Sequence, residues 1–79
     1  MNLDKLTNSF SNVLGLSIDK INDNLSYGTL GWDSVAHMKI IAAIEDSFDI
    51  MLETDDVIDM SSFKKAKEIL SKYGITFES

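Results

Sequence analysis

The chain has 79 residues, enough for one small domain over residues 1–79, and it contains no cysteine. Disulfides and thiolate zinc sites are therefore excluded, and no apolar run approaches the roughly 20 residues of a membrane helix. The net charge of −6, from 13 acidic residues against 7 lysines, argues against nucleic-acid binding and suits a basic partner. The first residues lack the pattern of a secretion signal, so we expect a cytoplasmic protein without membrane insertion.

The N-terminal third predicts one helix followed by a long loop. Apolar residues at helical spacing predict a helix over residues 3–14, which Gly15 ends. Residues 15–32 mix turn-forming Asn, Asp, Ser and Gly with scattered apolar residues. A connection this long suggests a loop that is pinned onto the helices and that has room for a short helical turn.

The second helix is predicted over residues 34–48, because no glycine or proline follows until after Phe48. Two apolar rows run along it at helical spacing. One row would face the core, and the other, formed by Val35, Met38 and Ala42, would be offered to a partner.

Two further helices complete the predicted fold. Thr54 is expected to cap a short helix with Asp55 and Asp56 in its first turn, and Ser61 or Ser62 to cap a helix over residues 62–73. Residues 75–79 are expected to form a loosely held tail. The pattern predicts an all-α fold: a small four-helix bundle, with three main helices and a short third one, and a long loop between the first two.

Residues 31–35, Gly-Trp-Asp-Ser-Val, hold the candidate functional group. Asp33 and Ser34 are both good N-cap residues, so the simpler interpretation of Ser34 is a helix cap. The alternative is a modification site, because unpaired N–H groups at a helix N-terminus favour a negative group. His37 has no second ligand candidate nearby, so we expect a solvated surface residue and no metal site.

These elements and residues together resemble the acyl carrier protein family. The family's Gly-x-Asp-Ser-Leu motif stands here with valine, Val35, in place of leucine. Residues 44–49 are similar to the end of its second helix, residues 55–57 to its acidic third helix, and residues 60–63 to the start of its fourth.

The resemblance implies a carrier rather than an enzyme. A phosphopantetheinyl transferase would attach 4′-phosphopantetheine to Ser34, and the thiol of this arm would hold an acyl group as a thioester. The partners would be acyl-transferring or condensing enzymes with basic docking patches, acting on a monomeric carrier. The implied partner-binding residues are Asp33, Val35, Met38, Ala42, Glu45, Asp46, Asp55, Asp56 and Ile58.

Several residues depart from the family pattern. His37 and Lys39 stand where carriers of fatty-acid biosynthesis usually have acidic residues, and Glu53 replaces a common proline. These changes favour a carrier in a specialised pathway. An aminoacyl or peptidyl carrier, and a non-carrier helical interaction module, remain alternatives. A calcium-binding EF-hand is disfavoured, because no register from Asp19 supplies the required glycine and glutamate.

Overall fold

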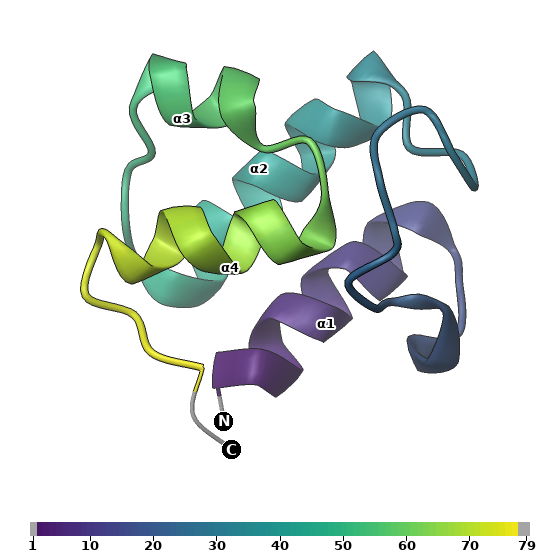
Figure 1. Cartoon of the computed structure of the whole chain (residues 1–79), viewed down its shortest axis with the longest axis horizontal. Coiled ribbons are helices and arrows are strands. Elements are labelled where there is room, and N and C mark those ends of the chain that lie inside the picture. The colour runs from purple at the N-terminus through teal and green to yellow at the C-terminus, as the bar shows by residue number, and fades with distance from the viewer. Residues whose placement is uncertain (1, 78–79) are drawn as a thin grey trace.

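The computed structural model describes residues 2–77, which form four α-helices and one 3-10 turn (Figure 1). The predicted all-α bundle is confirmed, and helix α1 packs against α2. Across this range, none of the helices combines the length and the apolar character needed to cross a bilayer. The elements are α1 (Asn2–Leu14), η1 (Ile18–Lys20), α2 (Ser34–Phe48), α3 (Thr54–Asp59) and α4 (Phe63–Ser71).

A single core collects apolar side chains from α1, α2, α4 and the connecting segments. Three aromatic rings lie at its centre, because the Phe10 ring meets Trp32 edge-on at 5.1 Å and Phe63 edge-on at 5.2 Å between centroids. Such edge-to-face pairs add stabilisation beyond that of the buried area alone. The buried apolar residues are Leu6, Phe10, Ile21, Leu25, Trp32, Ile40, Ile41, Ile44, Leu52, Met60, Phe63, Ala66, Ile69 and Leu70.

The long loop after α1 is held onto the bundle, as its apolar residues indicate. The 3-10 turn η1 supplies the short helical turn, and Ile21 and Leu25 are buried in the core. Backbone bonds join the loop to the start of α4, since Phe63 N–H donates to Leu25 C=O and Tyr27 N–H donates to Ser61 C=O.

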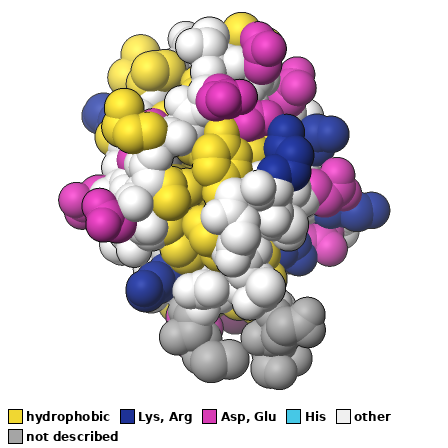
Figure 2. Space-filling view, turned by 90° about the vertical axis from the view of Figure 1, so that its left-hand side faces the viewer, with side chains coloured by type: hydrophobic (Ala, Val, Ile, Leu, Met, Phe, Trp, Pro, Cys, Tyr) yellow, Lys and Arg dark blue, Asp and Glu magenta, His cyan; other side chains and the backbone are white. Residues whose placement is uncertain are grey.

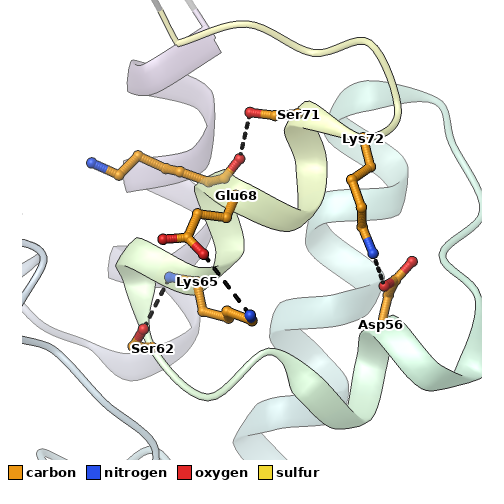
Figure 3. Close-up of polar contacts among 7 residues, drawn as sticks. Asp56, Ser62, Lys65, Glu68, Ser71 and Lys72 are labelled. Carbon is orange, nitrogen blue, oxygen red and sulfur yellow. Dashed lines mark hydrogen bonds and ion pairs between the residues drawn. The ribbon is translucent and has the colours of Figure 1, made fainter.

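Helix α4 begins at the second of its two candidate caps. The Ser62 hydroxyl accepts a hydrogen bond from the Lys65 N–H at 2.9 Å (Figure 3). The helix ends at Ser71, two residues earlier than predicted, and turns through residues 72–74. Gly74 has a φ of 85°, a backbone angle that glycine adopts at little cost.

The C-terminal segment differs from the prediction of a loose tail. Ile75 N–H donates to Leu70 C=O, and the Asn2 side-chain amide donates to Thr76 C=O at 2.9 Å. The Phe77 ring lies 6.3 Å from the Phe48 ring. The apolar residues of this segment therefore cover one end of the core, and the prediction was wrong for residues 75–77. Its last two positions, 78 and 79, lie outside the described residues.

Candidate functional site

The first turn of α2 separates the two cap candidates. The Asp33 carboxylate accepts a hydrogen bond from the Ala36 N–H at 2.8 Å, so Asp33 is the N-cap. Ser34 is the first helical residue and is exposed. Among the described residues, its hydroxyl forms no hydrogen bond with the rest of the protein. The simpler interpretation of Ser34 as a cap is therefore wrong, and its hydroxyl is free to react.

The turn before α2 places Ser34 outside while Trp32 enters the core. Leu30 and Gly31 both have positive φ, 51° and 85°. This conformation suits Gly31 but disfavours Leu30 by about 1–2 kcal/mol. Trp32 is 1% exposed, whereas Leu30 is 55% exposed. The backbone is thus held in a strained turn that exposes Leu30 and buries Trp32.

His37 is half-buried, which corrects the prediction of a solvated side chain. Its ring stacks on the Trp32 indole at 5.9 Å, with an interplanar angle of 18°. The Trp32 indole N–H donates to His37 Nδ1 at 3.0 Å, and His37 Nε2 lies 2.7 Å from the Val57 carbonyl oxygen. Both ring nitrogens are engaged, so His37 does not serve as a base for Ser34. Within residues 2–77 no cluster of three His, Asp or Glu side chains could hold a metal ion.

An apolar groove of about 370 Å³ opens beside Ser34, between α2 and α3. Its walls come from three places in the sequence: the loop, the first turns of α2, and the segment from α3 to α4. Met60 and Ser61 could not be expected here from the sequence, because only the fold brings them to α2. The groove residues are Tyr27, Ser34, His37, Met38, Val57, Ile58, Met60 and Ser61.

The predicted partner-binding side chains form an apolar group and an acidic group. All members of the apolar group are exposed. Val35, Met38 and Ile58 are 65%, 60% and 72% exposed, and Ala42 is exposed as well. Large apolar side chains gathered at the surface of a small protein are typical of an interaction site. Leu30 is exposed as well, and its position between two turn-forming glycines, Gly28 and Gly31, is the signal that could have indicated an exposed loop residue.

The acidic group is divided by the fold. Asp33, Asp46 and Asp55 are exposed, whereas Glu45 is half-buried and its carboxylate accepts from the Leu52 N–H at 2.9 Å. Figure 2 shows acidic side chains beside surface hydrophobic ones on the face at the left of Figure 1. Three of the predicted acids are therefore accessible to a basic partner, whereas the carboxylate of Glu45 is bonded within the protein.

Asp56 departs from the expected exposed position. It is 6% exposed, and its two carboxylate oxygens accept hydrogen bonds from Lys72 Nζ and the Tyr73 hydroxyl, both at 2.6 Å (Figure 3 shows the lysine). Tyr73 in turn accepts from the Glu53 N–H at 2.9 Å. Asp56 therefore ties α3 to the end of α4 and is not available to a partner.

This cluster shifts the pKa of each of its three groups. The hydrogen bond from Lys72, followed by that from Tyr73, holds the pKa of Asp56 below its ordinary value. The same carboxylate raises the pKa of Lys72 and that of Tyr73, because it stabilises the protonated form of both donors.

This small all-α bundle presents at the start of α2 an exposed serine that has no hydrogen-bond partner among residues 2–77. The sequence pattern described as "Phosphopantetheine attachment site" matches residues 4–70, and the chain belongs to this family. Its members attach 4′-phosphopantetheine covalently to a serine, so this is the cofactor of the chain. The match sets aside the alternative of a non-carrier interaction module.

One curated relative is the "Non-reducing polyketide synthase AC" of Didymella fabae, which is 32% identical to the chain over 59 residues. The aligned segment is 75% of this chain but 2% of the relative, so the chain spans a very small part of that protein's length. No solved structure matches the chain significantly.

Proposed function

We propose that the chain is an acyl carrier protein whose 4′-phosphopantetheine arm is attached to Ser34. The observation that carries this proposal is the exposed Ser34 hydroxyl, free of the capping bond that Asp33 makes instead. A phosphodiester at this position suits the site, because the first N–H groups of α2 and the helix dipole favour negative charge there.

Ser34 would act as the nucleophile that accepts the arm from coenzyme A, with a phosphopantetheinyl transferase and Mg²⁺ supplying the catalysis. The Ser34 oxygen forms a bond to the phosphorus next to pantetheine, and the phosphoanhydride P–O bond breaks. Adenosine 3′,5′-bisphosphate leaves, and the hydroxyl proton passes to the transferase. No base on the carrier is needed, which agrees with the engagement of both nitrogens of His37.

The attached arm supplies a thiol that holds the cargo as a thioester, although the chain itself has no cysteine. We propose an acyl cargo in a specialised pathway. The curated relative supports this, because it is named as a polyketide synthase. The chain is a substrate of its partners and not an enzyme. We further propose that the chain is a monomer and lies in the cytoplasm. The net charge of −6 favours the monomer, because copies of the chain repel one another.

The docking surface we propose surrounds Ser34 and continues along α2 to α3. Its apolar strip gives contact area, while its acids steer a basic patch of an acyl-transferring or condensing enzyme. Asp56 is left out, because its carboxylate is buried and bonded within the protein. The surface consists of Asp33, Val35, Met38, Ala42, Glu45, Asp46, Asp55 and Ile58.

Loading by a broad-specificity transferase tests the proposal. Wild-type protein, S34A and S61A are incubated with coenzyme A and Mg²⁺, and their intact masses are compared. Ser61 is a matched control, because it is also an exposed serine of the groove. Wild-type and S61A should each gain one phosphopantetheinyl group, while S34A gains none. Loading of S34A would overturn the assignment.

A further inference from the structure

A hydrogen-bonded chain crosses the gap between α2 and α3 beneath the groove. Its first bond runs from the Trp32 indole N–H to His37 Nδ1 at 3.0 Å. Indole N–H groups only donate, so Nδ1 must accept and carries no proton. His37 Nε2 therefore carries the proton and donates it to the Val57 carbonyl oxygen at 2.7 Å. We call Trp32, His37 and Val57 the crossbar.

The crossbar holds α3 by a backbone group that the short helix leaves unpaired. The last four carbonyls of a helix have no partner within it, and the carbonyl of Val57 is one of these in the six-residue α3 (Thr54–Asp59). His37 supplies the missing donor from α2. The bond therefore fixes the spacing of the two helices that form the groove walls.

The core side of the crossbar is filled. His37 lines the groove, but the ring stacked on it, Trp32, is 1% exposed. Phe10 packs edge-on against the indole at 5.1 Å. Met60, at the groove wall, is also 1% exposed. A side chain entering from the groove would have to displace this tightly packed layer, and protein interiors tolerate extra volume poorly.

The outer side offers apolar contact instead. Met38 and Ile58 stand on opposite walls and are largely exposed, and Tyr27 at the loop end is 47% exposed. An apolar chain lying between them would remove this surface from water. Ser34 lines the same groove, so cargo carried from it reaches these side chains without crossing the core.

We infer that the Trp32–His37–Val57 crossbar shuts the bundle core, so that an apolar acyl cargo carried from Ser34 lies in the outer groove, against Tyr27, Met38 and Ile58. This inference rests on the proposed function, because it needs an arm on Ser34. His37 is then a positioning residue, which sets where the cargo lies without reacting with it.

Isotope-filtered NMR on loaded protein tests this location. One labelled sample carries the 4′-phosphopantetheine arm alone. A second carries an arm to which octanoyl is joined by an amide, which does not hydrolyse as a thioester does. Intact mass confirms that each sample carries one arm. We expect nuclear Overhauser effects from the octanoyl chain to Tyr27, Met38 and Ile58, and none to Phe10 or Ile44. Contacts to Phe10 or Ile44, or no contacts with the protein at all, would overturn the inference while leaving the carrier function intact.

Variants then test the crossbar itself. In H37A the cargo should gain contacts to the Trp32 ring and to Phe10, because the imidazole no longer covers them. W32F keeps an aromatic ring but removes the donor, so it tests the hydrogen bond if H37A fails to fold. I18A removes an exposed apolar side chain of η1 and should leave the cargo contacts unchanged. Unchanged contacts in folded H37A would contradict the role of His37, and failure to load wild-type protein would overturn the proposed function with it.

Discussion

Asp33 and Ser34 are adjacent residues with the same capping potential, yet the structure gives them different tasks. Asp33 satisfies the Ala36 N–H, so D33A should lower the free energy of unfolding by about 1 kcal/mol. S34A removes an exposed hydroxyl without a partner among the described residues, so it should change stability by no more than about 0.5 kcal/mol. Urea unfolding of both variants checks this; an S34A loss equal to that of D33A would show that Ser34 caps α2 after all.

His37 provides a second prediction at this scale, because its two bonds allow a single neutral tautomer. Long-range ¹H–¹⁵N correlation spectra should place the proton on Nε2. W32F removes the donor to Nδ1 and part of a buried ring, so it should destabilise the protein by about 2 kcal/mol or more. T29S, a loop variant that keeps a hydroxyl to bond the Ser26 carbonyl, serves as control. A proton on Nδ1 would contradict the crossbar geometry.

At the scale of elements, α3 is too short to be stable by itself and depends on its anchors. One anchor is the Asp56 carboxylate, bonded to Lys72 and Tyr73 at the end of α4. The pKa of Asp56 is lower in the folded protein, so its contribution is fully present above its ordinary pKa of 3.8 and is lost as pH falls through the folded value. The pKa of Lys72 is raised, so its part is present below 10.5 and is lost as pH rises through the folded value.

Thermal melts across pH test this anchor. The stability difference between wild-type protein and D56N should be constant between about pH 5 and 9 and should shrink towards both extremes. D19N, which changes an exposed carboxylate on η1, should show no such profile. A difference between wild type and D56N that grows on acidification would contradict the folded-state pairing.

Helix α2 and the start of α3 carry the proposed docking acids. D46K and D55K should slow association with a basic partner enzyme at low salt, and the loss should diminish as salt screens the charges. Glu45 is unsuitable for this test, because its carboxylate also bonds the Leu52 N–H. D19K makes the same charge change on η1, which packs beside α1, and should leave association unchanged. Equal effects of D19K and D46K would mean that net charge alone steers the partner.

For the molecule as a whole, periodicity predicted the fold because each long helix buries one apolar stripe. Gly15 marks the end of α1, and Asp33 marks the start of α2. The absence of helix breakers explains why α2 continues to Phe48. The C-terminal segment was mispredicted because its few apolar residues make no pattern by themselves. Phe77 finds its partner, Phe48, in another element, and sequence spacing does not show such a contact.

The site was predictable where one short motif determines it and not where several elements meet. The place of Ser34 at the start of a helix and the apolar row on α2 follow from local sequence, whereas the attachment role of Ser34 came from the family resemblance and stays a prediction. Asp56 and His37 were misplaced. The family resemblance put Asp56 in the docking surface, and the lack of a second metal ligand put His37 in solvent, but each is paired with groups on another element. Polar residues buried by tertiary partners are the ones that a one-dimensional pattern misplaces.

The most direct test of the account locates the phosphopantetheinyl group at residue level. After incubation with coenzyme A, Mg²⁺ and a transferase, trypsin cleaves after Lys20 and Lys39 and releases residues 21–39, in which Ser26 and Thr29 are the other aliphatic hydroxyls besides Ser34. Fragment masses should carry the added group only when they include Ser34. An added group on fragments that end before residue 34, or none on folded protein whose mass shows it to be unmodified at the start, would contradict the assignment of Ser34 as the attachment site.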